Sequence, residues 1–558
     1  MKLLHNAKVY TQNPSQPGAS AIVIDQERII AVGEADELLS QYPNAEKQDM
    51  SGLMILPGLT DAHLHLQHYS LSLQKIDCET DTKEECLSRV EARVKKAKPG
   101  EWILGHGWNQ NVWQSPPLTV GDREASRSEA EGGLGVRGWP VASELDAIAP
   151  NNPVYLTAKS LHAGWANTAA LKLANVTSQT PHPHNGQIQH DAQGNVTGVL
   201  LETAMELVER AIPESTSDDI ANAIEKAQPI LWKLGLTGVH DFDRRESFVA
   251  LQKLHAQNKL KLRVLKNIPV ELLDQAFELG LRAGFGDDWL RIGSIKVFMD
   301  GVLGPHTAAM FQPYIGEGEN RGILNMDGEE LLEHGRKAAQ VGLGLTVHAI
   351  GDRANHEVLN AYEQLRAYET ENHLPALRHR IEHVQVIHPD DAARLGKMNI
   401  IASMQPIHAT SDMLMADQFW GPGRSALAYA IKTQLDFGAP LALGSDAPVE
   451  SPNPFWGIHA AVTRRRADGS PSADGWYPEQ KLTMAEALEG YTLGPAYAAN
   501  MESRLGRLAP GYLADLIVLE KDIFTCNPND LLTLKSSATM IGGEWVYASA
   551  GVPGGNKA

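Results

Sequence analysis

The sequence is poor in cysteine and has no long apolar run. Among its 558 residues are three cysteines, Cys78, Cys86 and Cys526, and no two of them form a CxxC pair. This pattern argues against a disulfide scaffold and favours a reducing compartment. No stretch of about 18 consecutive apolar residues occurs, and the N-terminal segment turns polar within a few residues. The sequence therefore predicts neither a membrane span nor a secretory signal, and we expect a cytoplasmic protein.

The chain is also short of positive charge. Its 49 Lys and Arg residues are outnumbered by 68 Asp and Glu residues, which gives a formal net charge of −19. A surface of this sign disfavours nucleic acid or an anionic membrane as the main partner, so we expect a small-molecule substrate. The hydrophobic share of 43% and the charged share of 21% are ordinary for a globular protein. The length allows one large domain with smaller ones beside it.

The two ends of the chain are predicted to be β-rich. Residues 2–11 and 20–33 read as short strands, and similar strands broken by Gly and Pro return at 506–522 and 538–548. Because chain ends often lie close together, we predict that residues 1–56 and 505–558 form one composite β-sandwich domain.

The middle of the chain alternates short apolar strands with amphipathic helices. Helical spacing of apolar residues is clear at 329–342 and 354–369. The expected strands number eight: 54–66, 236–241, 262–268, 292–300, 344–350, 379–386, 399–405 and 441–447. This α/β pattern over residues 57–504 predicts a (β/α)8 TIM-like barrel, with an open doubly wound sheet as the alternative.

A large insertion separates the first two barrel strands. Residues 70–232 are far too many for a loop and carry strand-like and helical pieces of their own. We expect an inserted subdomain, and since it leaves the barrel at the C-terminal end of the first strand, we expect it to act as a lid over that mouth.

Six side chains with metal chemistry are expected at that mouth. His63 and His65 share one face of the first strand, but a bare His-x-His is also an ordinary polar face. Five different strands place such side chains at the same level, because the C-terminal ends of barrel strands converge. The six are His63, His65, Lys296, His348, His383 and Asp446. Together they predict a metal site; alternatively Lys296 forms an ion pair with Asp300 and the site holds one metal.

The order of motifs resembles a known family. The segments "PGLTDAHLHL", "IKVFMDGVLGPHTA", "TVHAIGDRAN", "IEHVQ" and "LGSDAPV" are similar to the metal-dependent amidohydrolase superfamily. In particular they resemble amidohydrolase family 3, the branch that contains the N-substituted formamide deformylases. The likeness covers nearly the whole chain, including "GWANTAAL" in the insertion and the closing "GRLAPGYLADLIVL".

The resemblance implies a set of ligands. His63, His65 and Asp446 would bind a first metal, and His348 and His383 a second. Lys296 would bridge the two metals after its amine has reacted with CO2 to form a carbamate. One or two divalent ions are therefore expected, and imidazole and carboxylate ligands suit Zn2+ best.

The expected reaction is hydrolysis of a carbon–nitrogen bond other than a peptide bond. A metal lowers the pKa of bound water, which supplies hydroxide at neutral pH to attack a carbonyl. Asp446 would act as the proton shuttle to the leaving amine. The branch resemblance favours a linear amide such as an N-acyl or N-formyl amine. The alternatives are an esterase, a cyclic amidase or a deaminase with the same metals, or a non-catalytic protein that binds a metabolite or regulates.

Other residues are candidates for substrate contact. "LHAGWANTAAL" matches an insertion motif of the branch, although an ordinary packed segment is an equal alternative. Where the branch has Ser-Arg-Thr-Ala, this chain has "GPHTA", which puts any contact carried by that Arg in doubt. The candidates are His162, Trp165, Asn167, Asp300, His306, Gln405 and His408. For the oligomeric state, a homodimer is the expectation.

Overall fold

The structure is a computed structural model, and it describes the chain except for residues 110–112, 114–138, 160–162, 184–185 and 553–558. The chain divides into two compact units. The first comprises Met1–Ser70 and Ser217–Ala558, and the second is Leu71–Thr216. The second unit is thus inserted into the first, and the boundary at Ser70 falls within a short helix, α2 (Leu66–Ser72).

The core of the first unit is a parallel barrel sheet of eight strands. Neighbouring strands follow one another in chain order, from β6 to β13 and then one by one to β19. In an open doubly wound sheet, the order of the strands would instead reverse at a switch point. The strands are β6 (Leu59–Leu64), β13 (Leu236–Asp241), β14 (Arg263–Pro269), β15 (Leu290–Phe298), β16 (Leu345–Ala349), β17 (Arg380–His383), β18 (Ile401–Met404) and β19 (Leu441–Leu443). The expected TIM-like barrel is confirmed.

The last strand returns to the first through the segment that follows β19. Leu64 and Ala447 form a parallel bridge. The amide of Asp446 donates to the carbonyl of His63 at 2.7 Å, and the amide of His65 donates to the carbonyl of Ala447 at 2.9 Å. Residues expected to bind metal therefore lie where the ring of strands closes.

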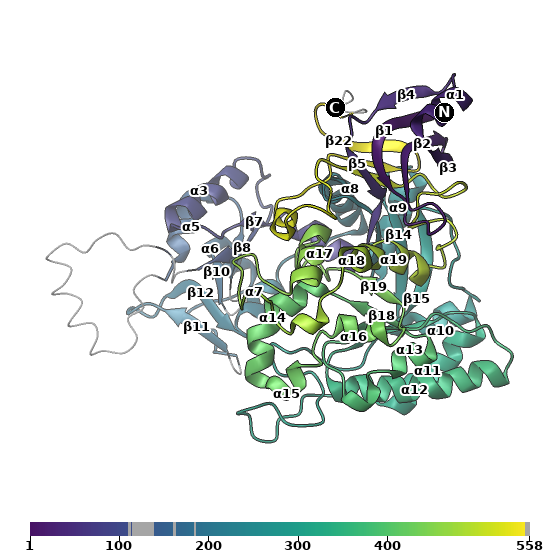
Figure 1. The fold of residues 1–558 in the computed structure, drawn as a ribbon. Helices are drawn as coiled ribbons and strands as arrows, with labels where there is room; N and C mark the ends of the chain where they lie inside the picture. The colour runs from purple at the N-terminus through teal and green to yellow at the C-terminus, as the bar shows by residue number, and fades with distance from the viewer. Residues whose placement is uncertain (110–112, 114–138, 160–162, 184–185, 553–558) are drawn as a thin grey trace. The chain divides into compact units, whose positions relative to one another are not determined.

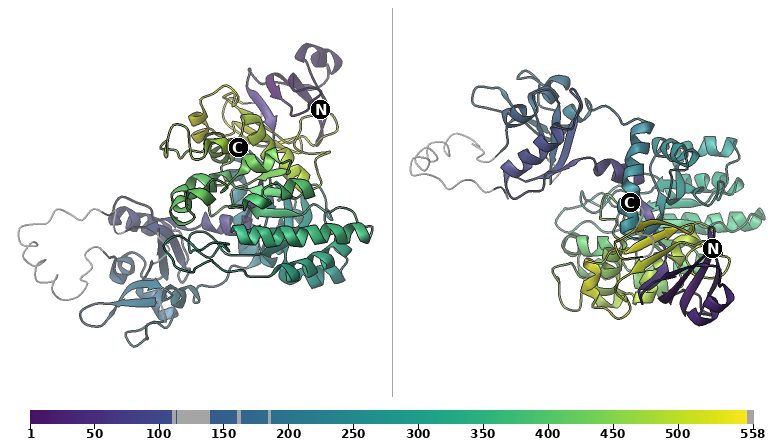
Figure 2. Two further views of the ribbon diagram at one scale, coloured as in Figure 1. Left: turned by 60° about the horizontal axis from the view of Figure 1, so that its bottom comes forward. Right: turned by 90° about the horizontal axis from the view of Figure 1, so that it is seen from above.

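Helices flank the strands, and several of them have one apolar face turned inward. In α11 (Gly328–Gln340) the side chains of Leu331, Leu332 and Ala338 are buried, and Asp327 caps the first turn by accepting from two backbone amides. This helix packs against α12 (Asp352–Glu371) outside the strands (Figures 1 and 2). The other helices of this unit's α/β part are α8 (Ser217–Lys233), α9 (Arg245–Ala256), α10 (Leu273–Glu278), α13 (Arg394–Met398), α14 (Pro406–Phe419), α15 (Pro422–Ser425), α16 (Ile431–Asp436), α17 (Pro454–Thr463), α18 (Met484–Gly490) and α19 (Leu493–Ala498).

Both ends of the chain contribute strands to one further sheet. Its order is β22-β21-β20-β5-β1-β2-β3, with β4 paired to β1, so purple and yellow strands lie side by side in Figure 1. A small helix, α1 (Ala35–Gln41), packs on it. The strands are β1 (Lys2–Tyr10), β2 (Gly18–Asp25), β3 (Arg28–Gly33), β4 (Glu46–Asp49), β5 (Met54–Pro57), β20 (Leu516–Leu519), β21 (Ala538–Ile541) and β22 (Glu544–Ala548). The arrangement as a two-layered sandwich stays a prediction.

The first expected barrel strand is in fact two strands. Met54–Pro57 is β5, which pairs antiparallel with β20 in the terminal sheet, and the barrel strand β6 begins at Leu59. Gly58 separates them at a close approach, since a Cβ there would lie 2.4 Å from Oγ1 of Thr237. Both strands are buried, so the apolar run in the sequence continues through the break and reads as a single strand.

The inserted unit has its own mixed sheet. The order is β11-β12-β10-β9-β8-β7, and a core that includes Trp108, Trp165 and Leu156 packs against it. Its elements are β7 (Ile76–Asp77), α3 (Lys83–Val94), β8 (Ile103–Trp108), α5 (Ala142–Ile148), β9 (Val154–Ala158), β10 (Ala163–Ala166), α6 (Thr168–Leu173), β11 (Gly186–His190), β12 (Val196–Glu202) and α7 (Met205–Glu209). The unit ends at Thr216, whereas the sequence placed the boundary at 232, because α8 packs against α9 and β13 of the barrel. Its role as a lid stays a prediction.

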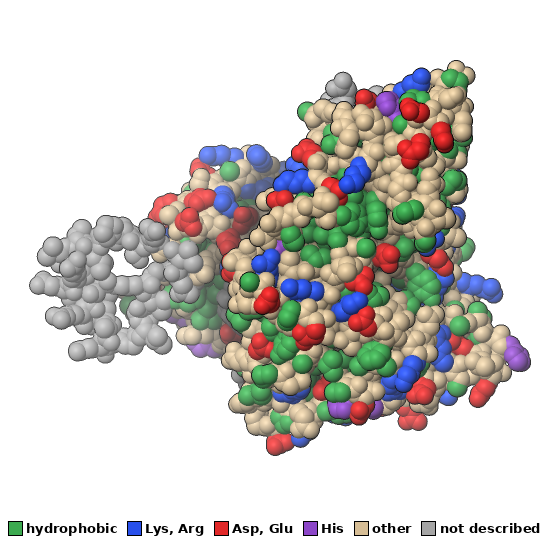
Figure 3. Space-filling model, in the orientation of Figure 1, with side chains coloured by type: hydrophobic (Ala, Val, Ile, Leu, Met, Phe, Trp, Pro, Cys, Tyr) green, Lys and Arg blue, Asp and Glu red, His purple; other side chains and the backbone are tan. Residues whose placement is uncertain are grey.

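The surface carries charges of both signs. On the face drawn in Figure 3, acidic and basic side chains are interspersed rather than gathered by sign. Within the described part of the chain, no helix combines the length and the apolar character needed to cross a bilayer.

Candidate metal centre

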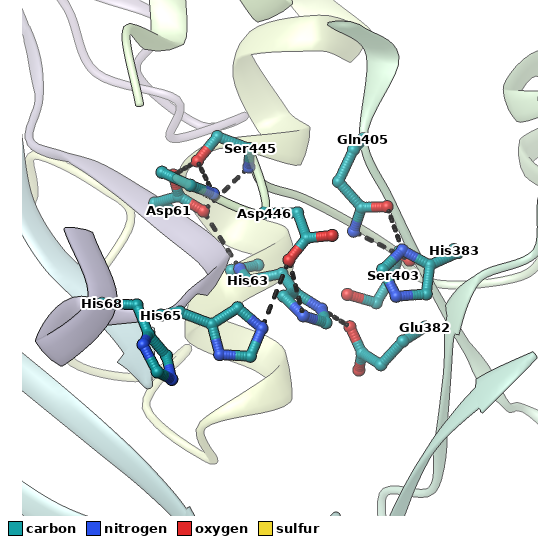
Figure 4. Close-up of polar contacts among 12 residues, drawn as sticks. Asp61, His63, His65, His68, Glu382, His383, Ser403, Gln405, Ser445 and Asp446 are labelled. Atoms are coloured by element: carbon teal, nitrogen blue, oxygen red, sulfur yellow. Dashed lines mark hydrogen bonds and ion pairs between the residues drawn. The ribbon is translucent and has the colours of Figure 1, made fainter. Parts of the chain in front are cut away.

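Three side chains converge at the C-terminal end of β6. His63 and His65 come from β6 and the residue just after it, and Asp446 comes from the segment after β19 (Figure 4). The Nε2 atoms of both imidazoles lie 3.4 Å from the same oxygen of Asp446, Oδ1. Ligand atoms at such separations can surround one cation, since zinc–nitrogen and zinc–oxygen bonds are about 2 Å long.

Two carboxylates fix the direction of these imidazoles. Nδ1 of His63 lies 2.6 Å from Glu382, and Nδ1 of His65 lies 3.1 Å from Asp243. An ionised carboxylate only accepts, so each Nδ1 donates to its carboxylate and each Nε2 faces Asp446. This carboxylate–histidine arrangement is the usual support of metal-binding imidazoles. The donor set therefore fits a divalent cation.

Asp61 ties the two ligand-bearing segments together. Its carboxylate accepts from the backbone amides of His63 and Ser445, each at 3.0 Å, and from the Ser445 hydroxyl at 2.5 Å. Burial raises the pKa of Asp61 to about 7 despite these hydrogen bonds. Its role is to hold the backbone of both segments in register.

His383 and His348 lie beside this group. Nδ1 of His383 donates to Oε1 of Gln405 at 2.8 Å, which leaves its Nε2 free to ligate. The ring of His348 lies 4.6 Å from that of His383, and its own Nε2 donates to the carbonyl of Gly301 at 3.0 Å. Ligand atoms of His383, His408 and Asp446 lie within 4.8 Å of one another, as do those of His63, His65 and Asp446.

Two of these ligands sit on strained backbone. His383 has a φ of 76° and Asp446 a φ of 61°, a region that residues other than glycine seldom adopt. Such conformations cost on the order of 1–3 kcal/mol and persist where the surroundings over-determine them. Here they turn both side chains inward at the points where β17 and β19 end.

Lys296 lies near these side chains, and no acidic group in the described part of the chain forms an ion pair with it. Its Nζ contacts the rings of Phe242 and Phe298, at 4.8 and 4.6 Å from their centroids. Burial of the ammonium lowers the pKa of Lys296 to about 8. The ion pair with Asp300 that the sequence left open does not form among the described residues, because Asp300 instead accepts from the backbone amides of Ala309, Ile350 and Gly351.

Burial keeps two of the imidazoles neutral, whereas two carboxylates favour the protonated form of His65. Burial lowers the pKa of His63 to about 4 and that of His348 to about 3. Burial would also lower the pKa of His65, but its contacts with Asp243 and Asp446 raise it to about 9. Burial would raise the pKa of Asp446, yet the imidazoles of His63 and His65 hold it well below its usual range. A cation that binds His65 must therefore displace a proton.

Four candidate substrate contacts lie in the barrel unit. Gln405 and His408 are buried beside His383, and Gln405 accepts from Nδ1 of that imidazole. Asp300 is buried and links the segments after β15 and β16, and burial raises its pKa to about 7. His306 forms a hydrogen bond with Glu317, and its ring centroid lies 4.0 Å from that of Phe419. These contacts indicate a packing role for His306.

The candidates of the insertion have packing roles within their own unit. Trp165 is fully buried, and its indole N–H donates to the carbonyl of Val141 at 3.0 Å. Asn167 caps α6 by accepting from the amide of Ala170 at 3.0 Å, and it also accepts from the amide of Val154 at 2.9 Å. His162 lies outside the described residues.

We expect Asn167→Ala to destabilise the inserted unit by about 1–3 kcal/mol, because two buried backbone amides lose their acceptor. Metal content should not change, since the side chain belongs to a different unit from the ligands. Urea unfolding and metal analysis of the same preparation measure both. An unchanged unfolding free energy together with a raised KM would instead support substrate contact.

Two supporting acids, Asp243 and Glu382, were not predicted from the sequence. Asp243 follows "VHDF" at the end of β13, and Glu382 precedes His383 within the apolar strand β17. The signal that could have found them is an acidic residue within or just after a buried strand. A buried carboxylate needs a partner, so such a residue is expected to pair with another side chain. Arg380, two residues earlier, supplies one for Glu382 at 2.8 Å.

The barrel and its cluster of imidazoles and carboxylates are typical of metal-dependent hydrolases. The chain belongs to the amidohydrolase family, whose sequence profile matches residues 46–547. A profile for an imidazolonepropionase-like composite domain of bacteria also matches residues 21–45.

Similar proteins cover nearly the whole chain. Protein LONG AFTER FAR-RED 3 of Arabidopsis thaliana is 32% identical over 98% of this chain and 91% of its own. The N-substituted formamide deformylase of Arthrobacter pascens is 28% identical over 98% of each chain. Among solved structures, an uncharacterized metal-dependent hydrolase from Pyrococcus furiosus has a TM-score of 0.75 at 29% identity, over 94% of this chain and 100% of its own.

Proposed function

We propose that this protein hydrolyses the carbon–nitrogen bond of a linear amide, an N-acyl or N-formyl amine, with bound Zn2+. The observation that carries the proposal is the pair of imidazoles, His63 and His65, whose Nε2 atoms are aimed at Asp446 by the carboxylates of Glu382 and Asp243. The likeness to an N-substituted formamide deformylase supports the choice of a linear amide.

The residues of the site hold the cation and keep it in place. His63, His65 and Asp446 supply nitrogen and oxygen ligands, and the closure of the barrel fixes their backbones through the amides of His65 and Asp446. When bound, a divalent cation lowers the pKa of a coordinated water and polarises a carbonyl oxygen. The protein contributes preorganisation, because its ligands are buried and already oriented.

Asp446 is the proton carrier in this proposal. Its pKa lies well below the usual range, so the carboxylate is ionised at neutral pH and can accept a proton. It takes a proton from the attacking water as the new carbon–oxygen bond forms. It then gives that proton to the amine nitrogen as the carbon–nitrogen bond breaks. The products are a carboxylic acid and a free amine.

We also propose that Lys296 is carboxylated by CO2. Carboxylation needs the neutral amine, and burial lowers the pKa of Lys296 to about 8. The uncharged fraction therefore rises as the pH passes upward through about 8. The oxygen-donor anion formed in this way can serve as a metal ligand.

We expect carboxylation of Lys296 to be greater at pH 8.5 than at pH 6.5 when metal-free protein is reloaded with Zn2+ in 13C-bicarbonate. The reason is the larger neutral fraction of the amine above its pKa of about 8. Carbon-13 NMR detects the carbamate, and the Lys296→Met variant identifies its resonance by losing it. A metal-loaded protein without any carbamate signal at either pH would contradict the proposal.

A substrate panel tests the proposed activity. It compares the N-formyl and N-acetyl derivatives of one amine with the matching formate ester, a cyclic imide and an amino-substituted heteroaromatic ring. We expect kcat/KM for a linear amide to exceed the others by at least about tenfold, a discrimination that pocket contacts can supply. A preference for the ester or for either ring compound would replace the proposal with an esterase, a cyclic amidase or a deaminase.

A further inference from the structure

A buried ion pair lies beside the carboxylate that supports His65. Lys266 of β14 is 2% exposed, and its Nζ lies 2.7 Å from Oδ2 of the fully buried Asp241. The two residues are direct partners in the parallel pairing of β13 with β14. The same ammonium also donates to the backbone carbonyl of Asp243. One cation thus joins the last residue of β13 to the residue two positions beyond it.

The carboxylates of this segment hold the backbone that follows His65. Oδ1 of Asp241 accepts from the amide of Leu66 at 3.0 Å, and Oδ2 of Asp243 accepts from the amide of Gln67 at 2.5 Å. These amides begin α2, and the first amides of a helix have no acceptor within the helix itself. Two side chains from another strand therefore cap α2. Because His65 immediately precedes α2, the cap also fixes the backbone of His65.

Asp243 uses its two carboxylate oxygens for different contacts. Oδ2 holds the amide of Gln67, while Oδ1 lies 3.1 Å from Nδ1 of His65. The position of the Asp243 backbone therefore affects both the direction of the His65 ring and the place of the main chain beside it. Lys266 holds that backbone through the carbonyl of Asp243.

The charge of Lys266 is needed where it lies. Within the described residues it is the one cation that forms an ion pair with Asp241, whose other side-chain partner is the neutral Ser247 hydroxyl at 3.1 Å. Asp241 and Asp243 are both buried. Without the ammonium, two acidic side chains would be buried close together with one counter-charge fewer, which is strongly unfavourable. The segment that carries them would shift, and the metal ligand that it supports would shift with it.

We propose that Lys266 is a positioning residue of the metal centre, which keeps His65 in its ligating orientation by holding the segment of Asp241 and Asp243. The inference rests on the proposed function, in which His65 is a ligand of the cation. It predicts more than a contribution to stability. The affinity for a cation at His65 should depend on Lys266, whereas it should not depend on buried ion pairs elsewhere in the barrel.

The test compares two buried ion pairs of one strand in the full-length chain. Arg263 begins β14, three residues before Lys266, and its Nη2 lies 2.8 Å from the buried carboxylate of Asp515. Lys266→Met and Arg263→Met each remove the cation of such a pair, so both should lower the unfolding free energy in urea. In a Co2+ titration followed by the visible spectrum, Lys266→Met should bind about tenfold or more weakly, and Arg263→Met should bind as the natural protein does.

A double variant separates positioning from stability. In Lys266→Met/Asp241→Asn no buried carboxylate is left without its counter-charge, so the unfolding free energy should recover toward that of the natural protein. The affinity for Co2+ should nevertheless stay about tenfold or more below the natural value, because no ammonium holds the carbonyl of Asp243. This variant carries the test if Lys266→Met alone does not fold.

NMR of the metal-free protein supplies a readout independent of turnover. The Nδ1 proton of His65, hydrogen-bonded to Asp243, should give a downfield resonance that moves or is lost in Lys266→Met and stays in Arg263→Met. An unchanged Co2+ affinity in the folded double variant, or an equal loss of affinity in Lys266→Met and Arg263→Met, would overturn the inference. If the predicted loss of affinity occurs but the natural protein cleaves no amide, the inference stands and the proposed hydrolysis fails.

Discussion

The Asp446→Asn variant is expected to lose about 10²- to 10⁴-fold in kcat for amide hydrolysis, with a smaller change in KM. Asparagine keeps the shape and one oxygen of the side chain, but it cannot accept and return a proton at neutral pH. His63 and His65 stay in place through Glu382 and Asp243, so at least one cation should still bind, with lower affinity.

Steady-state kinetics and metal analysis on one preparation measure this result. Asp436→Asn is the matched control, because Asp436 pairs with Lys432 at the surface with its side chain 60% exposed. The control should retain its turnover. An Asp446→Asn enzyme that keeps its kcat would show that another group carries the proton. Loss of all bound metal would assign the whole effect to ligation.

The Glu382→Gln variant is expected to be the most destabilised of the variants considered. Glu382 is fully buried, binds Nδ1 of His63 at 2.6 Å, and pairs with the buried guanidinium of Arg380 at 2.8 Å. Removing one partner of a buried ion pair leaves an uncompensated charge and costs about 3–5 kcal/mol. Replacing the carboxylate that orients His63 with a neutral amide should also weaken metal binding by about 10- to 100-fold.

Urea unfolding and metal titration test both parts of this prediction. Glu363→Gln is the control, since Glu363 pairs with Arg394 at the surface and its side chain is 71% exposed. A pair of that kind contributes about 0–1 kcal/mol. If Glu382→Gln matched the control in both unfolding free energy and metal affinity, the orienting role of Glu382 would be wrong.

The barrel could be predicted because its strands are buried and its helices are amphipathic. Buried parallel strands such as "GLTVHAI" read as short apolar runs, and the convergence of their C-terminal ends predicts that His63, His348 and Asp446 lie at one mouth. The break at Gly58 was not visible, because β5 and β6 are both buried and no polar residue marks the change of sheet.

The supporting interactions could not be predicted from sequence patterns. Glu382 and Asp243 meet their imidazoles across long separations in the chain, and only the closed barrel brings them together. The sheet of the insertion has a strand order, β11-β12-β10-β9-β8-β7, that mixes local hairpins with distant pairings.

The central claim is that hydrolysis depends on a divalent cation held by His63, His65 and Asp446. The direct test is to strip the natural protein with a chelator, verify by elemental analysis that the metal is gone, and measure kcat/KM for an N-formyl amine before and after Zn2+ is returned. The account predicts a fall of at least about 100-fold on stripping and recovery on reloading. Metal-free protein that cleaves the amide as fast as the reloaded protein would contradict it.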